Sequence, residues 1–275
     1  MIVSIVVVLY RKAVEESISV CSILGILDGM KAAGFFPRVY IWNNSPGWVL
    51  PLVHEDVTWF EGDNVSLPLI YNDIADLAFT SGSSALLISD DDTDYARFDF
   101  ESCFRVVEKM LSDGQENQVG AFLPQIMSGG RLVSPGGRKL FKGYLFDQIK
   151  SGLIDSCNVL AINSGMIVTR VCYERMRPLY DARLNFYGTD TEFFVRYQCH
   201  FKKIYVLDAV LEHSLSSDTR ESPDRALFRW KDNIKAMDVV FERESFAFKL
   251  LMRIYYALVK FKLFVKFRDW RFLKI

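Results

Sequence analysis

The chain has 275 residues, of which 50% are hydrophobic and 14% aromatic, and this composition excludes a disordered protein. The length suits one large domain, or one domain with an appendage. The formal net charge is only −1, but residues 245–275 carry eight Lys and Arg against one acid, so we expect this tail to meet an anionic surface; a nucleic-acid partner is not expected.

The five cysteines are scattered, odd in number and without a C-x-x-C pair, which predicts reduced thiols instead of a disulfide framework. The apolar run Ile2–Leu9 is too short for a membrane span and lacks the flanks of a signal peptide. Both features predict a cytoplasmic body.

Apolar runs alternate with helical spacing through the first ninety residues. The expected strands are 2–10, 38–42, 57–60 and 85–89, and the expected helices are 14–33 and 67–79. This order predicts an α/β fold, Rossmann-like, with a mostly parallel central sheet flanked by helices. In such sheets ligands bind beyond the carboxyl ends of the strands.

The second half is less regular. Residues 119–124 and 161–168 are expected strands, and the glycine-rich segment 128–139 between them is an expected loop without an assigned role. From Phe246 onward the pattern is long, basic and aromatic.

Four carboxylates crowd behind the fourth strand, in "LLISDDDTD". Asp90, Asp91 and Asp92 stand where a ligand would bind, and an Asp-x-Asp at a strand end suits a hard divalent cation that holds phosphates. A solvated turn is the alternative, and the motif by itself does not separate the two.

A second acidic segment, "YGTDTEFFVR", is typical of a helix start. Thr189 and Glu192 fit a capping box, and Glu192 can pair with Arg196 one turn later. Asp190 either complements the helix dipole or, from a loop–helix junction, serves as a general base. His213 is a third candidate, because it follows an expected strand that begins near Tyr205.

In this order the pieces resemble family 2 glycosyltransferases of the GT-A fold, and bacterial rhamnosyltransferases and galactofuranosyltransferases of surface polysaccharide above all. The matching segments, spanning about residues 1–216, are "IVSIVVVLY", "WNNSP", "NVSLPLIYNDIADLA", "LLISDDDT", "NSGMIV", "LYDARLNFYGTDTEFFVR" and "LEHSLS".

The resemblance implies roles for individual residues. Asp92 would bind Mn²⁺ or Mg²⁺ with His213, and Asp190 would be the general base. The nucleotide sugar would meet the residues Asn43, Asn64, Asn72, Asp90 and Asp91. The acid that the family carries after the second strand is absent, with Trp42 or Asn43 in its place, and Val65-Ser66 replaces the usual glycine after the first asparagine.

The implied activity is inverting transfer of a sugar from dTDP-rhamnose or UDP-galactofuranose to a lipid-linked glycan, in O-antigen or capsule synthesis. The protein would then be peripheral on the inner face of the bacterial cell membrane. A sugar nucleotidyltransferase would usually show a glycine-rich basic loop after the first strand, and a haloacid dehalogenase phosphatase would place its acids after the first strand. Three expected strands precede the acids here, which argues against the phosphatase. The nucleotidyltransferase and a non-catalytic nucleotide-binding module stay open as alternatives.

Residues 1–216 are therefore expected to form the GT-A domain and residues 217–275 a helical appendage. If one helix runs through the tail, basic residues fall within a ~60° sector at Lys249, Arg253, Lys260, Arg271 and Lys274. We expect residues 245–275 to lie on anionic lipid, with packing on the body or on a second subunit as the alternative.

Overall fold

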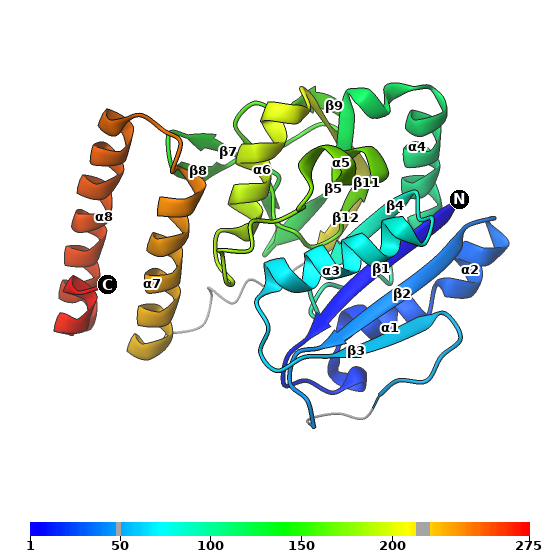
Figure 1. Cartoon of the computed structure of the whole chain (residues 1–275), viewed down its shortest axis with the longest axis horizontal. Helices are drawn as coiled ribbons and strands as arrows, with labels where there is room; N and C mark the ends of the chain where they lie inside the picture. Colours follow the sequence, from blue (N-terminus) through cyan, green and yellow to red (C-terminus); the bar gives the residue numbers. More distant parts are fainter. Residues whose placement is uncertain (48–50, 213–220) are drawn as a thin grey trace.

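The structure, a computed structural model, describes residues 1–47, 51–212 and 221–275 (Figure 1). Strands and helices alternate through the first half, as β1 (Ile2–Leu9), α1 (Ile18–Leu24), α2 (Leu27–Ala32), β2 (Phe36–Asn43), β3 (Val57–Glu61), α3 (Leu67–Thr80), β4 (Ala85–Ser89) and α4 (Phe100–Ser112). The second half adds β5 (Val119–Ser128), β6 (Arg131–Ser134), β7 (Gly136–Lys139), β8 (Lys142–Leu145), β9 (Gly152–Asp155), β10 (Val159–Leu160), β11 (Met166–Thr169), α5 (Arg170–Met176), α6 (Thr189–His200), β12 (Lys203–Glu212), α7 (Pro223–Val240) and α8 (Phe246–Phe267).

The described strands form one large sheet and one small one. The large sheet has the order β3-β2-β1-β4-β11-β5-β12-β9, with β6 paired to β5, and the small one is β10-β7-β8. Strands β1 to β4 are mutually parallel, whereas β11 runs antiparallel between β4 and β5. The mostly parallel α/β sheet expected from the sequence is therefore confirmed.

Two hydrophobic cores cover the two faces of this sheet. Along β1, Val3, Ile5 and Val7 contribute to a core with α1, α2 and α4, and Val6 and Val8 contribute to a core with α3, α5 and α6. Alternate residues of a strand point to opposite faces, so a strand that is apolar throughout needs helices on both sides. That explains why "IVSIVVVL" carries hardly any polar residue.

Three expected elements differ from the structure. The helix expected over residues 14–33 is instead a short 3₁₀ helix (Val14–Glu16) followed by α1 and α2, which separate at Gly25 and Ile26. The strand expected over 161–168 is shifted to β11, because Asn163, Ser164 and Gly165 form a turn before it. The glycine-rich segment 128–139 is not a loop: Gly129 and Gly130, both with positive φ, turn the chain from β5 into β6, and β7 follows.

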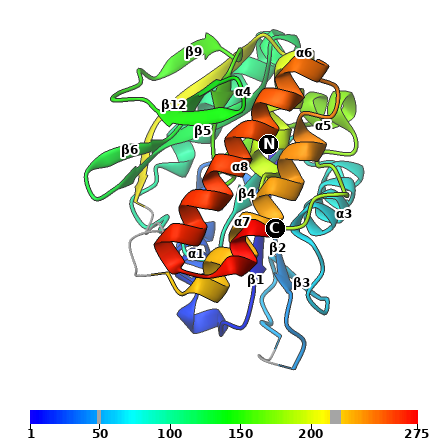
Figure 2. The same ribbon diagram turned by 90° about the vertical axis from the view of Figure 1, so that its left-hand side faces the viewer.

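Helices α7 and α8 form a pair beside the sheet domain, with α7 between α6 and α8 (Figures 1 and 2). Leu184, Met237, Phe241, Met252 and Tyr256 build a separate core for this pair. Among the described residues, none of the helices combines the length and the apolarity that crossing a membrane requires. All five cysteines are free, as expected.

Candidate active site

Four parallel strands end at one edge of the sheet and bring their last residues together. Leu9 pairs with Asn43, Asn43 with Glu61, and Val7 with Ser89, so β1 to β4 finish side by side. Asp90 is the first residue beyond β4. The acidic cluster therefore lies at the carboxyl edge of the sheet, where α/β folds bind their ligands.

Asp90 is held by Ser164, a serine in the turn before the antiparallel strand β11. Because β11 is antiparallel to β4, it begins where β4 ends, and the turn before it places the Ser164 hydroxyl as a donor to Asp90 Oδ2. Gly165 makes this turn possible: its φ is +76°, and a Cβ there would lie 2.6 Å from Leu211 Cδ1. The contact joins residues 74 apart in sequence.

The acidic loop is also tied to helix α1. Ser19 Oγ donates to the carbonyl oxygens of Asp90 (2.5 Å) and Thr93 (2.8 Å), and Ser17 Oγ donates to that of Asp91 (2.9 Å). The N–H of Thr93 returns a bond to Ser19 Oγ at 2.8 Å. A loop anchored in this way is fixed in place, unlike the solvated turn that the sequence left open.

Lys12 supplies a positive charge to the cluster. Its Nζ lies 3.1 Å from Asp91 Oδ2, and both side chains are largely shielded from solvent. Burial raises the pKa of the Asp91 carboxyl, Lys12 opposes this rise, and the charge of Asp92 adds to it. Asp91 is thereby paired with a cation of the chain itself.

Asp190 lies half-buried in the first turn of α6. Its Oδ1 accepts the N–H of Thr191 at 2.7 Å. Burial raises the pKa of Asp190, and the negative charge of Asp90 raises it further. The two carboxylates, from the end of β4 and the start of α6, thus lie within electrostatic range of each other.

The start of α6 is one residue earlier than the capping box requires. Gly188, with φ +80°, is the N-cap, and Thr189 is already helical and caps nothing. A Cβ on Gly188 would lie 2.7 Å from Ala236 Cβ of α7, so close helix packing selects glycine at this position. The expected capping box at Thr189 and Glu192 is therefore wrong.

Glu192 has the structural role that the sequence favoured for it. Its carboxylate pairs with Arg196 at 2.7 Å, one helical turn away. Arg196 also donates to the carbonyl oxygens of Met176, Pro178 and Leu179, which fixes the segment that leads toward α6. The expected ion pair is confirmed.

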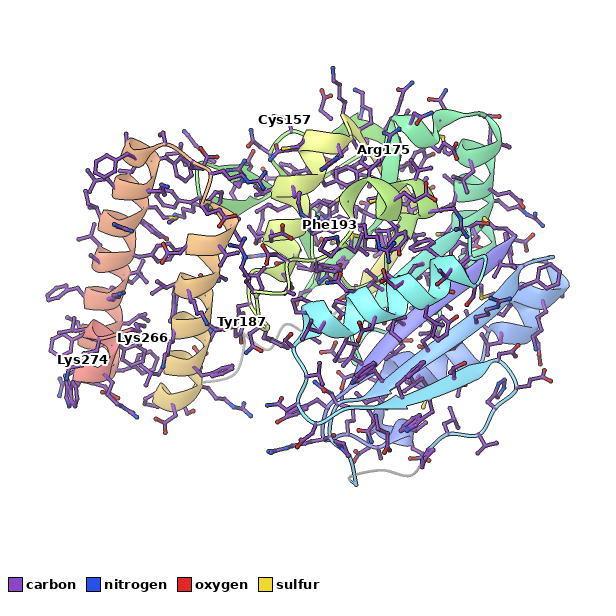
Figure 3. All side chains as sticks on the ribbon, in the orientation of Figure 1. Cys157, Arg175, Tyr187, Phe193, Lys266 and Lys274 are labelled. Atoms are coloured by element: carbon purple, nitrogen blue, oxygen red, sulfur yellow. The ribbon has the colours of Figure 1, made fainter. Side chains whose placement is uncertain are left out.

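A loop contact from α7 supports the same region. Asp232 accepts the backbone N–H groups of Phe186 (3.3 Å) and Tyr187 (2.9 Å), just before Gly188. Tyr187 lies at the end of α6 that faces α7 (Figure 3). The position of Asp190 thus depends on α7 as well as on the sheet.

Three buried tyrosines lie behind the carboxylates. Burial raises the pKa of Tyr71, Tyr95 and Tyr180, and the charge of Asp90 contributes to the rise in each case. The Tyr180 hydroxyl donates to Asn163 Oδ1 at 2.9 Å. All three side chains are almost completely shielded from solvent.

The three expected asparagines have different surroundings. Asn43 is fully buried: its Oδ1 accepts from the N–H and Oγ of Ser45, and its Nδ2 donates to Glu61. Asn72 uses both amide atoms on the backbone of Tyr180, at 2.9 Å each, so it positions the segment before α6. Asn64 is exposed, with φ +51°, in the turn before α3.

The donor chemistry of the cluster fits a hard divalent cation. Asp90 and Asp92 carry carboxylate oxygens, the ligand type that such a cation prefers. Among the described residues, three or more His, Cys, Asp and Glu side chains do not gather into a metal-binding group. His213, the expected further ligand, lies outside the described residues.

Ser164, Lys12, Ser17 and Ser19 were not anticipated as site residues. Glu61, at the end of β3 beside Asn43, is another acid that the sequence did not single out. A signal for Glu61 existed, because it follows an expected strand in the same way as Asp90 does. For Ser164 the signal was its place in the matching segment "NSGMIV". For Ser17, Ser19 and Lys12 the sequence offered only positions far from the acids along the chain.

Protein-family models and curated sequences give no match to this chain. Solved structures do: GalNAc-T7, crystallised with UDP, GalNAc and Mn²⁺, matches with a TM-score of 0.60 at 11% identity, over 94% of this chain and 50% of that one. TarS 1–349 of S. aureus matches with a TM-score of 0.52 at 12% identity, over 88% of this chain and 65% of that one. The chain thus spans about half to two thirds of these structures, and it has the GT-A fold that they share.

Proposed function

We propose that the protein is a metal-dependent, inverting glycosyltransferase that uses a nucleoside diphosphate sugar. The observation that carries the proposal is the position of the acidic loop at the carboxyl edge of the sheet, where Ser164 holds Asp90, in a GT-A fold. The neighbour crystallised with UDP, GalNAc and Mn²⁺ supports a nucleotide-sugar donor and a cation. The donor sugar is proposed to be rhamnose or galactofuranose, and the acceptor a lipid-linked oligosaccharide of bacterial surface polysaccharide.

In this mechanism Asp190 acts as the general base. The acceptor hydroxyl attacks the anomeric carbon while the bond from that carbon to the diphosphate oxygen breaks, and the hydroxyl proton moves to Asp190. A base with a raised pKa takes that proton more readily, and attack on the face opposite the leaving group inverts the configuration.

The acidic loop would hold the donor. Asp92, together with His213, is proposed to bind Mn²⁺ or Mg²⁺, and the bound cation supplies Lewis-acid stabilisation of the charge on the departing diphosphate. Ser164 and the α1 serines keep the loop carboxylates in place before the donor arrives. Asn64 and Asp91 are proposed to line the nucleotide side, with Asn43 and Asn72 positioning that wall from behind.

The proposed mechanism also assigns a role to each part of the chain. Residues 1–216 are proposed to form the catalytic domain and residues 217–275 the helical appendage, with 245–275 in contact with the inner face of the cell membrane. A lipid-linked acceptor would then be met where it is anchored.

Calorimetric titration of UDP and dTDP into the protein, with and without Mn²⁺, tests the proposal. We expect one nucleotide to bind only when Mn²⁺ is present. Release of a nucleoside diphosphate from the matching sugar nucleotide would support glycosyl transfer. Formation of a nucleoside triphosphate after addition of pyrophosphate would indicate a nucleotidyltransferase instead, and the absence of binding by either nucleotide would refute the proposed donor site.

Ser164→Ala is expected to weaken Mn²⁺-dependent nucleotide binding by roughly 3- to 10-fold, because Asp90 loses a hydrogen bond that fixes its carboxylate. The measurement is the same titration. Ser112→Ala is the matched control, since the Ser112 hydroxyl bonds only to the Lys109 carbonyl on an exposed part of α4. Equal affinities for the wild type and Ser164→Ala would show that Ser164 does not position Asp90 for binding.

A further inference from the structure

Helix α8 has two apolar faces, and only one of them is covered. On the inner face Met252, Tyr256 and Leu263 are buried against α7 and the terminal segment. On the other side six large apolar side chains are between 47% and 65% exposed: Leu250, Leu251, Ile254, Leu258, Phe261 and Val265. At 100° per residue these six fall within a sector of about 100°, opposite the buried face. We name them the outer stripe.

Basic residues border the outer stripe on both sides. At 100° per residue Arg253 lies about 60° beyond one edge of the outer stripe, and Lys262 and Lys266 lie about 20° and 60° beyond the other edge. Lys260 and Lys249 lie on the same side as Arg253 but farther round, toward the buried face. The helix carries no acid from Phe246 to Phe267. The borders are therefore uniformly positive.

The end of the helix continues this surface. Helix α8 ends at Phe267, where Arg268 adopts φ +53°, so one helix does not run through Lys274. The sector expected for a single continuous helix therefore does not extend beyond Lys260. In the 3₁₀ turn that follows, Trp270 is 58% exposed and the Lys274 ammonium lies 4.0 Å from its ring centroid. Arg271 differs, because it pairs with Asp224 and Asp269. Lys266 and Lys274 both lie at this end of α8 (Figure 3).

We propose that the outer stripe docks on an anionic lipid bilayer, with α8 lying in the plane of the interface. The apolar side chains would enter the acyl boundary while the two basic borders meet lipid phosphates, an arrangement typical of interfacial helices. A second copy of the chain fits less well, since pairing two outer stripes would bring two positive borders together without an acid to offset them. Charge complementarity therefore favours the lipid surface.

The docking surface stands close to the proposed active site. Helices α8, α7 and α6 lie side by side in this order, and the first turn of α6 carries Asp190 (Figure 1). With helix axes about 8–10 Å apart, Asp190 lies on the order of 20 Å from α8. The inference rests on the proposed function and extends it. With α8 on the membrane, the proposed base Asp190 would lie at a distance from the lipid surface that the glycan of a lipid-linked acceptor can reach.

Flotation of the full chain with vesicles tests the docking surface without nucleotide or acceptor, so its outcome is separate from that of the proposed reaction. We expect flotation with vesicles that contain about a third phosphatidylglycerol, and little with pure phosphatidylcholine. Leu258→Gln with Phe261→Gln is expected to lower the bound fraction at least about 10-fold. The matched control replaces two equally exposed apolar residues of the body, Phe36→Gln with Val210→Gln, and should float like the wild type.

The charges give a second, independent measurement. Lys262→Gln with Lys266→Gln removes one border, and roughly fivefold weaker partitioning per charge is expected on anionic vesicles. Both lysines are exposed, so their replacement leaves the helix core intact. Equal flotation of the wild type on neutral and anionic vesicles, or unchanged flotation of both double variants, would overturn the proposal. So would sedimentation velocity that shows a dimer lost in Leu258→Gln with Phe261→Gln while the wild type does not float.

Discussion

Asp190→Asn is expected to lower kcat by about 10²- to 10⁴-fold, because the variant has no base to take the acceptor proton. The amide keeps the shape of the carboxylate, and its oxygen can still accept the N–H of Thr191. Donor affinity should therefore change little. The measurement is the turnover of sugar nucleotide with acceptor, alongside the affinity for the nucleotide.

The pH dependence of kcat is a second test of the role proposed for Asp190. Asp190 must be ionised to act, and burial and Asp90 raise its pKa, so kcat should fall on acidification at a pH above the ordinary range of an aspartate. A carboxyl whose pKa is higher in the folded state than in the unfolded state destabilises the fold once it is ionised, and this cost disappears below the unfolded pKa. Asp190→Asn should consequently melt at the same temperature as the wild type, or higher, at neutral pH.

Glu192→Gln is the matched control for the first turn of α6. It weakens the pair with Arg196 and should lower the melting temperature without removing turnover from the folded protein. If Asp190→Asn kept near-normal turnover, or if both variants lost activity only in proportion to their stability, the general base would have to be another group.

Asp92→Asn is expected to weaken Mn²⁺-dependent nucleotide binding by at least about 10- to 100-fold, the range in which even supporting residues of metal sites act. Asp90→Asn should have a similar effect, since both carboxylates belong to the proposed donor loop. Titration of the nucleotide at several Mn²⁺ concentrations measures it. If the substitution changes only the affinity for the cation, a high Mn²⁺ concentration should restore part of the lost nucleotide affinity.

Asp94→Asn is the control for this loop. Its carboxylate is exposed and caps the N–H of Ala96 at 2.8 Å, so it shares the charge and the neighbourhood but not the proposed role. Equal losses in Asp94→Asn and Asp92→Asn would mean that net charge, and not a specific donor set, governs binding.

The sequence was sufficient for the architecture because the signals involved are local. Continuous apolar runs mark strands that are covered on both faces, and the acid cluster directly follows one of them. The edge of the sheet at which Asp90 lies could therefore be predicted. The ion pair of Glu192 and Arg196 could be predicted for the same reason, since one helical turn separates the two residues.

The environment of the acids could not be predicted, because it is made by contacts between distant segments. Ser164 reaches Asp90 only since β11 runs antiparallel and starts at the edge where β4 ends. Lys12 and Ser19 reach the same loop across more than seventy residues. Nothing in the neighbourhood of either residue along the chain marks it for that contact.

Two predictions of local structure, the start of α6 and the loop at 128–139, were wrong for a different reason. At Gly188 the limit is set by the closeness of α7, which a capping pattern does not register. In the glycine-rich segment 128–139, composition favours a loop, but pairing with β5 turns part of it into strand. Tertiary contacts decided both cases over local preference.

The place of α7 has a practical consequence for anyone preparing this protein. Its inner side holds the loop before Asp190 through Asp232 and Ala236, while its other side forms the base on which α8 rests. A shortened clone that stops before Pro223, made to improve solubility, would lose support for the proposed general base together with the tail. Point changes in the outer stripe remove only the proposed docking surface and leave this shared helix untouched, so they are the better route to a full-length protein for kinetics.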